Sequence, residues 1–586
     1  MENRKYQFLI EEKPEGLHIS SQITEEGELV TIRLHVESKE EQIFLPTVCS
    51  VVVPACEIHE IWSPKIHLIK ALNLDWFQYL KKTNGFTGAP VQCLIGIDNQ
   101  NRAALGISDT LNTFEFQAVP VEETGEYAFR ICMFMEEHIP KKTYDVELRL
   151  DLRRLPYYRV LDEMAAWWEK EKRNHPAAVP ADAKEPMYST WYSFHQMVEE
   201  KALLKQCRLS RELGCRSILL DDGWQTEDGN RGYAYCGDWQ NATSKIPDMA
   251  AFVKKVHDLD MKVIPWYSLP FIGEKSENFS NFQDMLIDPD AKRQWHVLDP
   301  RYPKVREFII SLFEQALDEW DVDGFKMDFI DEFVVTPFGG KEADPRRDFE
   351  SFHEAADCMM KECTSRLKAK KPDILLEFRQ TYNGPMMRSY GNIFRAVDCP
   401  FDAVENRVRV TDVRLLCRNS AVHSDMIMWH PKDTVESAAL QIINILFSVP
   451  QISMRLDELS KEHQEMLAFY MGIWKKYRDP LINGTFEPLN PISRYNVIKG
   501  ACNGQLACVW HENAVVMLEQ IYEKMLFVNG TAIGKLYLDC KESAGRYEIR
   551  CYDCTGHLLK KEQATVEAGF KQYEVPPSGV LEFCRI

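Results

Sequence analysis

The feature that most constrains the fold is an alternation of short apolar runs with long helical patterns between residues 184 and 478. The apolar runs have the length of strands, and most precede a segment with the 3.6-residue periodicity of an amphipathic helix. Eight strands that alternate with helices over about 290 residues predict a central (β/α)8 TIM barrel, an α/β fold. The predicted strands lie at residues 187–193, 217–224, 262–268, 323–329, 374–380, 393–398, 425–430 and 451–456.

A doubly wound open sheet is the alternative α/β fold. That fold carries a glycine-rich phosphate turn after its first strand. Here the first strand ends in Trp191 and Tyr192, without such a turn. The barrel is therefore the favoured prediction.

The regions on either side of the barrel have a different pattern. Residues 1–155 contain short apolar runs broken by Gly, Asn, Pro or charged residues, which predicts an N-terminal β-sandwich. Residues 156–183 are interpreted as one amphipathic helix and a linker rich in Pro and Ala. The β pattern returns in residues 484–586, where we predict a small C-terminal antiparallel β-domain, again a β-sandwich. The barrel itself is assigned to residues 184–478.

The charge balance restricts the partners. The 70 Lys and Arg residues against 89 Asp and Glu residues give a formal net charge of -19. Nucleic acids and anionic membranes attract cationic proteins, so neither is an expected partner. The sequence contains neither the apolar core of a signal peptide nor a run of about 18 apolar residues, and its 17 Cys follow no disulfide framework. We therefore expect a cytoplasmic protein with reduced thiols.

One segment near the C-terminus has the spacing of metal ligands. Cys551, Cys554 and His557 lie close together, but a zinc site needs a fourth ligand and no second Cys pair accompanies them. A strand followed by a turn is the favoured interpretation. We expect no metal and no organic cofactor.

Polar or aromatic side chains follow every predicted barrel strand. Active sites of (β/α)8 barrels lie at the C-terminal ends of the strands, so these side chains should meet there. Carboxylates bind sugar hydroxyls and indoles cover the apolar face of a pyranose, which predicts a carbohydrate site. The residues are Trp191, Asp221, Asp222, Trp266, Lys326, Asp328, Glu377, Arg379, Arg395, Asp398, Trp429, His430 and Arg455.

Asp328 is the sharpest candidate for a nucleophile. Lys326, two residues earlier, points to the same side of the strand and would keep the carboxylate ionised. The structural alternative is a Lys–Asp pair that closes the top of the barrel. Asp221 and Asp222 form a second acidic pair, and they could hold two sugar hydroxyls unless Asp222 only caps the loop.

Asp398 is the predicted second carboxylate. Cys399 and Pro400 follow it, and partial dehydration there would raise its pKa as a proton donor requires. An Asx turn before the proline is the structural alternative. Asp402 and Glu405 are rivals for the acid role.

Together these motifs resemble the retaining α-galactosidases of glycoside hydrolase family 36, and the resemblance extends over all three regions. It implies that Asp328 is the nucleophile and Asp398 the acid/base. It further implies that Asp221 and Asp222 bind the sugar's 4- and 6-hydroxyls, with Lys326 and Arg395 near other hydroxyls and with Trp191 and Trp266 lining the pocket. The motifs, in chain order, are Trp191-Tyr192, the segments 220–225, 237–239, 298–309 and 326–328, and Arg395 to Asp398.

The chain departs from the family at two segments. The family has Glu-x-Cys-x-Gly-Gly after the fifth strand, where the Cys and a Gly contact carbon 2 of the sugar, but residues 377–384 here begin with Glu377 and Arg379. Arg379 therefore leaves room for a 2-acetamido or an anionic sugar. The segment around the acid also differs: many members have Ser-Asp-Asp/Asn-Thr-Asp, whereas residues 395–402 here are Arg-Ala-Val-Asp-Cys-Pro-Phe-Asp. His423, Asp425 and His430 have no counterpart in the family, and His430 could reach the site from the seventh strand end or be structural.

The predicted activity is that of a retaining α-glycosidase, an α-galactosidase acting on terminal α-galactosides by double displacement. Retention requires carboxyl groups about 5–5.5 Å apart, and inversion roughly 6.5–9.5 Å. The alternatives are an α-N-acetylgalactosaminidase or other related α-glycosidase, galactosyl transfer of the raffinose-synthase type, and a non-catalytic carbohydrate-binding protein. The expected partner is an oligosaccharide, and the exposed β-domains offer surfaces for a homo-oligomer.

Overall fold

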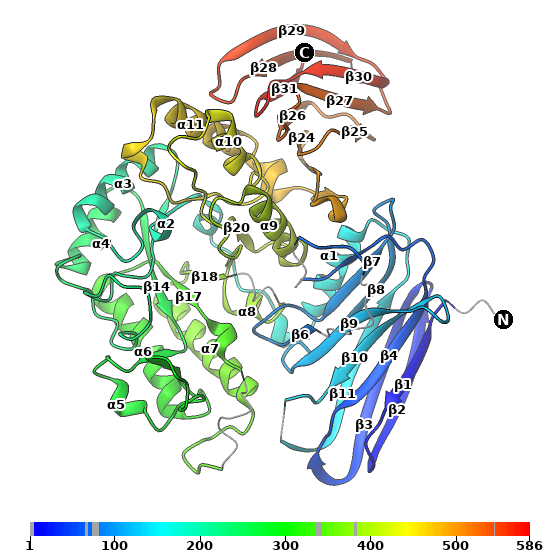
Figure 1. Ribbon diagram of the computed structural model, residues 1–586, viewed down its shortest axis with the longest axis vertical. Helices are drawn as coiled ribbons and strands as arrows, with labels where there is room; N and C mark the ends of the chain where they lie inside the picture. The colour runs from blue at the N-terminus through cyan, green and yellow to red at the C-terminus, as the bar shows by residue number, and fades with distance from the viewer. Residues whose placement is uncertain are drawn as a thin grey trace.

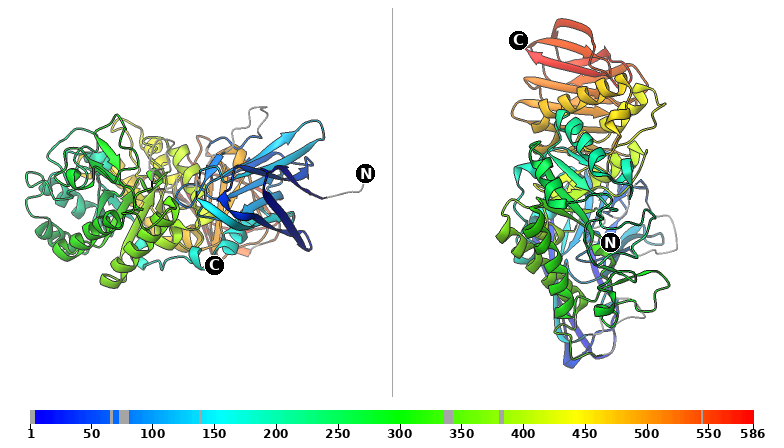
Figure 2. Two further views of the ribbon diagram at one scale, coloured as in Figure 1. Left: turned by 90° about the horizontal axis from the view of Figure 1, so that it is seen from below. Right: turned by 90° about the vertical axis from the view of Figure 1, so that its left-hand side faces the viewer.

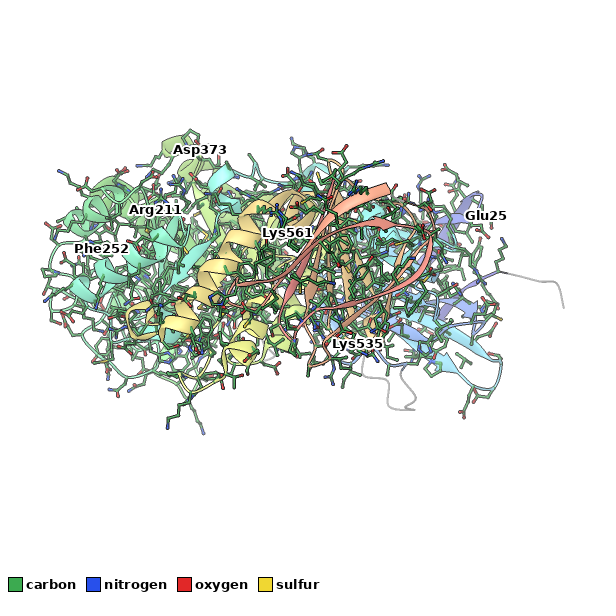
Figure 3. All side chains as sticks on the ribbon, turned by 90° about the horizontal axis from the view of Figure 1, so that it is seen from above. Glu25, Arg211, Phe252, Asp373, Lys535 and Lys561 are labelled. Carbon is green, nitrogen blue, oxygen red and sulfur yellow. The ribbon has the colours of Figure 1, made fainter. Side chains whose placement is uncertain are left out.

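The computed structural model describes residues 5–64, 68–72, 81–136, 139–334, 343–379, 384–543 and 545–586. Figure 1 shows three parts: N-terminal sheets in blue and cyan, a barrel with its helices in green and yellow, and C-terminal sheets in red. The N-terminal sheets and most barrel helices lie at opposite ends of the molecule (Figure 2, left). Figure 3 gives the same division from above, with Arg211 and Phe252 at the barrel end, Glu25 at the other end, and Lys535 and Lys561 on the C-terminal sheets.

Two antiparallel sheets share one hydrophobic core in the N-terminal part. Strand β3 alternates buried and more exposed residues, so Ile32 and Leu34 face inward and meet Val51 and Phe129 of the other sheet. The five-stranded sheet has the order β1 (Gln7–Glu12), β4 (Thr47–Pro54), β10 (Glu126–Met133), β9 (Phe114–Val121), β6 (Lys81–Thr83). The six-stranded sheet has the order β2 (Leu17–Glu26), β3 (Leu29–Ile43), β11 (Pro140–Asp151), β8 (Asn101–Ile107), β7 (Val91–Ile95), β5 (Glu60–Trp62).

Eight parallel strands form the barrel in the middle of the chain. Two parallel bridges, from His423 to Val449 and from Ile427 to Ile452, close the barrel between the two strands that stand at the ends of the order given next. The strand order is β20 (Ala421–His423), β19 (Ile393–Arg395), β18 (Leu375–Arg379), β17 (Gly324–Asp328), β14 (Lys262–Ser268), β13 (Ser217–Leu220), β12 (Met187–Ser189), β21 (Gln451–Ile452). A small hairpin of β15 (Phe271–Gly273) and β16 (Trp295–Val297) follows β14. The predicted (β/α)8 fold is confirmed.

Helices surround the barrel and begin at residues that the sequence marks. Side chains of Asp248, Ser351, Thr434 and Ser460 each accept a hydrogen bond from the backbone N–H three residues later, which caps the helix. The α-helices are α1 (Tyr157–Trp168), α2 (Trp191–Phe194), α3 (Glu200–Glu212), α4 (Met249–His257), α5 (Phe279–Phe282), α6 (Pro303–Trp320), α7 (Phe352–Lys370), α8 (Met387–Tyr390), α9 (Ala403–Cys417), α10 (Val435–Ile443) and α11 (Lys461–Lys476). Among the described residues, none of the helices has both the length and the apolar character needed to cross a membrane.

The C-terminal part consists of two packed sheets above α10 and α11 (Figure 1). Most strand pairs are antiparallel, as predicted, whereas β24 with β26 and β25 with β27 are parallel. The larger sheet has the order β22 (Glu487–Leu489), β23 (Val497–Cys502), β24 (Gln505–Trp510), β26 (Lys524–Asn529), β31 (Val580–Arg585), β28 (Gly545–Tyr552), β29 (Leu558–Val566). The smaller has the order β25 (Val515–Leu518), β27 (Lys535–Cys540), β30 (Gly569–Glu574).

A buried group of charged and aromatic side chains ties the three parts together at α9. Asp412 of α9 accepts hydrogen bonds from the Nζ of Lys70 at 2.7 Å and from the Nε1 of Trp62 at 2.9 Å. The hydroxyl of Tyr495 donates to the same carboxylate. We call Trp62, Lys70, Asp412 and Tyr495 the junction cluster.

One barrel strand was predicted at the wrong place, and one barrel helix was not predicted. The seventh strand is Ala421–His423, and residues 425–430 form a loop in which Ile427 makes an isolated bridge, because their apolar side chains reflect burial more than strand pairing. Helix α9 was not predicted. It is buried on several sides, so its sequence lacks the apolar stripe of a surface helix.

Candidate active site

Asp328 ends strand β17 and is buried at the mouth of the barrel. Its Oδ2 accepts a hydrogen bond from the indole Nε1 of Trp266 at 3.0 Å, and its Oδ1 accepts one from the backbone N–H of Phe329 at 2.9 Å. The Nε of Arg379 lies 3.2 Å from the same Oδ1. Burial alone raises the pKa of Asp328, but Arg379, Lys326 and the indole outweigh it and hold that pKa below its usual value. The carboxylate is therefore ionised at neutral pH.

Lys326 does not form the direct pair with Asp328 that was the structural alternative. Its Nζ donates to the Oδ2 of Asp221 at 2.7 Å, while Asp328 pairs with Arg379. The lysine nevertheless lowers the pKa of Asp328 through space, in the direction that the sequence predicted. The sequence could not show which carboxylate Lys326 would bind, because both Asp221 and Asp328 lie at strand ends close to its ammonium group.

Asp222 lies in the turn after β13, held by two amides. The Nε2 of Gln225 donates to its Oδ1 at 2.7 Å, and the Nε2 of Gln196 to its Oδ2 at 2.8 Å. Burial raises its pKa to about 6, because these neutral donors and Lys245 only partly offset the loss of water. Gln196 is a site residue that sequence reasoning missed, and no motif marks it.

Asp398 follows β19 and is held by Arg395. The Nη2 of Arg395 donates to its Oδ1 at 2.9 Å, and its side chain remains 38% exposed. Burial raises the pKa of Asp398, but Arg395, Lys326 and Arg379 lower it more, so it lies well below its usual range. The expectation of a raised pKa is therefore wrong for the unliganded protein, because the sequence did not reveal that Arg395 turns back onto this carboxylate.

The two rival acids have other roles. Asp402 caps α9 by accepting a hydrogen bond from the backbone N–H of Glu405 at 2.8 Å. Glu405 pairs with Arg409 at 2.5 Å. Neither side chain hydrogen-bonds to the groups around Asp328.

Arg395 is fully buried and faces three carboxylates. Its Nη1 donates to the Oδ1 of Asp425 at 2.6 Å, its Nη2 donates to Asp398, and its Nε lies 3.6 Å from the Oε1 of Glu377. We call Arg395, Glu377, Asp398 and Asp425 the guanidinium cluster. Lys326 and Arg379 lower the pKa of both Asp328 and Asp398, so the two carboxylates share one electrostatic field.

Glu377 lies below the site surface. It is completely buried, and its Oε2 accepts a hydrogen bond from the Nε2 of Gln451 at 2.6 Å. Burial raises its pKa to about 7, against the opposing effect of Arg395. Its position beside the guanidinium allows it to orient Arg395. Residues 380–383, which belong to the segment that departs from the family pattern, lie outside the described residues.

Aromatic rings line one side of Asp328. Trp266 is stacked on Tyr233 with ring centroids 6.1 Å apart and is edge-on to Trp239 at 5.7 Å. Trp191 is half-buried at the start of α2, and the guanidinium of Arg231 lies 5.4 Å from its ring centre. Tyr233, in a loop without strand or helix pattern, was missed because nothing in the sequence placed that loop over the barrel.

The remaining predicted rim residues have their described contacts with groups other than Asp328 and Asp398. Trp429 is buried and its Nε1 donates to the Nδ1 of His463 at 3.2 Å. His430 is exposed and its Nδ1 accepts from the backbone N–H of Lys432 within a turn. Arg455 packs over the ring of Phe194.

The C-terminal Cys segment has the predicted form of a strand and a turn. Cys551 ends the buried face of β28, and the turn closes by a hydrogen bond from the backbone N–H of Asp553 to the carbonyl of His557. Within the described ranges, no three His, Cys, Asp or Glu side chains are placed to hold a metal ion.

The barrel sequence identifies the family. The sequence model of the Melibiase family matches residues 159–479, which is more than half of the chain. The chain belongs to the melibiase family. Alpha-galactosidase 1 of Pediococcus pentosaceus is 28% identical over 176 residues, which are 29% of this chain and 23% of that protein. Alpha-galactosidase AgaA of Geobacillus stearothermophilus is 25% identical over 202 residues, 33% of this chain and 26% of its own. The matched segment thus spans about a quarter of these melibiase relatives.

Solved structures extend the likeness in fold to the whole chain. The galactosidase domain of the alpha-galactosidase-sucrose kinase AgaSK aligns with a TM-score of 0.65 at 14% identity and covers 99% of this chain and 82% of that one. The GH36 alpha-galactosidase AgaA from Geobacillus stearothermophilus aligns with a TM-score of 0.64 at 15% identity, covering 100% and 87%. A variant of AgaA has been solved in complex with raffinose. This melibiase-family chain therefore has the three-part architecture of those enzymes.

Proposed function

We propose that this melibiase-family protein is a retaining α-glycosidase that hydrolyses terminal α-galactosides. The observation that carries the proposal is the pair Asp328 and Asp398, two carboxylates of different environment that share the field of Lys326 and Arg379. Related proteins named alpha-galactosidase, and the raffinose complex of one of them, support the sugar and the oligosaccharide class of substrate.

The chemistry follows from the two environments. The ionised Asp328 attacks the anomeric carbon, and the bond to the leaving oxygen breaks as protonated Asp398 gives that oxygen its proton. Asp398, now ionised, removes a proton from water, which displaces Asp328 and releases the sugar with its configuration retained. Since Asp398 has a low pKa in the free protein, substrate must raise it by covering the exposed part of its side chain.

Sugar recognition is assigned to the polar and aromatic groups around this pair. Asp221 and Asp222 can accept hydrogen bonds from hydroxyls, and Lys326 and Arg395 can donate to hydroxyl oxygens. An indole edge or face covers the apolar side of a pyranose, a role that we assign to Trp191 and Trp266.

One observation favours a second candidate. The guanidinium of Arg379 lies against the nucleophile, with its Nε 3.2 Å from Asp328, where the family pattern has a small Cys. Such a donor suits an acetamido or anionic substituent next to the anomeric carbon. An α-glycosidase for a 2-substituted sugar is therefore the alternative substrate class.

A trapping experiment tests these proposals. A series of 2-deoxy-2-fluoro α-glycosyl fluorides should label Asp328, and peptide mapping would identify the residue. A panel of nitrophenyl α-glycosides separates galactose from 2-acetamido and uronic acid sugars. Labelling of another residue, or a product of inverted configuration, would overturn the assignment.

We also propose a cytoplasmic location and a homo-oligomeric assembly. All 17 cysteines are free thiols, and most are buried, which suits a reducing compartment. Cell fractionation and light scattering of the purified protein test the two statements.

A further inference from the structure

Asp425 is a buried carboxylate that the two-residue mechanism does not use. Its Oδ1 accepts from the Nη1 of Arg395 at 2.6 Å, and its Oδ2 accepts from the backbone N–H of Cys399 at 2.7 Å and from the hydroxyl of Tyr192 at 2.8 Å. It is completely buried. We propose that Asp425 is the positioning residue of the acid/base group, which fixes Asp398 and keeps it able to carry a proton. This inference rests on the proposed function.

The backbone of Asp425 is itself held in place. Its N–H donates to the Oδ1 of Asn406, and its carbonyl accepts from the Nδ2 of the same amide, both at 3.0 Å. Asn406 lies on α9, so a helix supports the loop that carries Asp425. The carboxylate therefore has one orientation, and its hydrogen bonds define the positions of its partners.

Asp425 acts on Asp398 along two routes. It binds the N–H of Cys399, the next residue after Asp398, which fixes the turn that presents the acid. It also holds one arm of Arg395, whose other arm donates to Asp398. A shift of Asp425 would move both the backbone and the cation that surround the acid.

The shared cation also couples the protonation of the two acids. Two carboxylates on one guanidinium repel each other, and the charge of Asp398 raises the pKa of Asp425. Burial raises the pKa of both acids, but for Asp398 the combined effect of Arg395, Lys326 and Arg379 is larger than that of burial. If Asp425 lost its charge, the whole field of Arg395 would act on Asp398 and its pKa would fall further. The other charged or titratable groups that face this pair are Tyr192, Lys326, Glu377, Arg379, Cys399, Arg409 and His423.

The test compares two leaving groups in the full-length Asp425→Asn variant. An α-galactoside with a sugar leaving group needs a proton from Asp398, but 4-nitrophenol leaves without one. We expect kcat/KM at pH 7 to fall about tenfold for raffinose and less than about twofold for the nitrophenyl substrate, the general acid being worth at least that much. The alkaline limb of the raffinose pH profile should move to lower pH. Tyr192→Phe leaves the charge of Asp425 in place and removes one hydrogen bond to its carboxylate. It should therefore shift the substrate ratio and the alkaline limb in the same direction as Asp425→Asn, but by less.

A matched control comes from the junction cluster. Asp412→Asn also removes a buried carboxylate from a cation and a tyrosine hydroxyl, but away from the site. It should leave the ratio between the two substrates unchanged. The proposal would be overturned if Asp425→Asn lost the same factor of kcat/KM on both substrates and kept the alkaline limb of its pH profile. It would also be overturned if Asp412→Asn altered the ratio between the two substrates as Asp425→Asn does.

A structural measurement separates this inference from the proposed function. If the wild-type protein cleaves neither substrate, the proposed function fails, and a crystal structure of Asp425→Asn still tests positioning. We expect Arg395 and the 398–402 turn to be displaced in that structure. Unchanged positions for both would overturn the role of Asp425 whatever the substrate.

Discussion

The junction cluster and the guanidinium cluster are built from the same kinds of parts but differ in their charge balance. In the junction cluster one lysine, Lys70, pairs with one aspartate, Asp412, and a tyrosine and a tryptophan also donate hydrogen bonds to that carboxylate. In the guanidinium cluster a single arginine faces three carboxylates. In the junction cluster the charges of Lys70 and Asp412 balance, whereas the excess of carboxylates around Arg395 makes the guanidinium cluster sensitive to any charge that enters. The first arrangement suits a structural contact and the second suits acid–base chemistry.

The largest expected effect distinguishes catalysis from stability. Asp328→Ala should lower kcat by about 10⁴-fold or more, because the covalent step loses its nucleophile. Its free energy of unfolding should change less than that of Asp412→Asn, since Arg379 beside Asp328 is 19% exposed to water whereas Lys70 is completely buried. Steady-state kinetics and urea unfolding check both statements. Wild-type turnover in Asp328→Ala would contradict the assignment.

Asp412→Asn should give the opposite result. Lys70 would remain buried without its counter-charge, which destabilises proteins by about 3–5 kcal/mol. The expected result is a lower urea midpoint with kcat unchanged in the folded fraction. Asp318→Asn, which removes an exposed pair with Lys370, is the control and should have almost no effect on stability. A loss of kcat without a loss of stability would remove the distinction between the clusters.

The third prediction uses pH. Burial gives Glu377 a pKa of about 7, and the unfolded chain releases this proton near pH 4.3. The folded form thus retains the proton longer, and its stability is lost as pH rises from about 4.3 to 7. Glu377→Gln should reduce the difference in unfolding free energy between pH 5 and pH 8, by up to about 3 kcal/mol. Chemical denaturation at both pH values measures it, and an unchanged difference would show that Glu377 is ionised throughout.

The smallest effects come from the two tyrosines. Tyr495→Phe removes one hydrogen bond to Asp412 and should lower the free energy of unfolding by about 1 kcal/mol, with activity retained. Tyr192→Phe removes the equivalent bond to Asp425 and should instead change the pH profile. Thermal melts and pH–rate curves of both variants make the comparison direct. Identical profiles for the pair would indicate that the two clusters do not differ in function.

The sequence predicted the barrel and most strand-end residues because both follow local patterns. Hydrophobic periodicity located α3, α4, α6, α7, α10 and α11. The rule that active sites of such barrels lie at the strand ends predicted that Asp328, Arg379 and Arg395 lie close together. The pairing of charges was not predictable, since it depends on side-chain direction across strands. Lys326 therefore binds Asp221, and Asp398 accepts a hydrogen bond from Arg395. Gln196 and Tyr233 reach the site from loops whose paths no periodicity describes.

Helix α9 bears on how far the barrel could be treated as a transplantable module. Asn406 near its start holds the loop of Asp425, and Asp412, less than two turns later, binds Lys70 of the N-terminal part. Excision of the N-terminal sheets would remove from Asp412 both its counter-charge, Lys70, and its hydrogen bond from Trp62. A shortened form of the protein would then need a redesigned α9, in which position 412 is apolar, for the isolated barrel to remain folded.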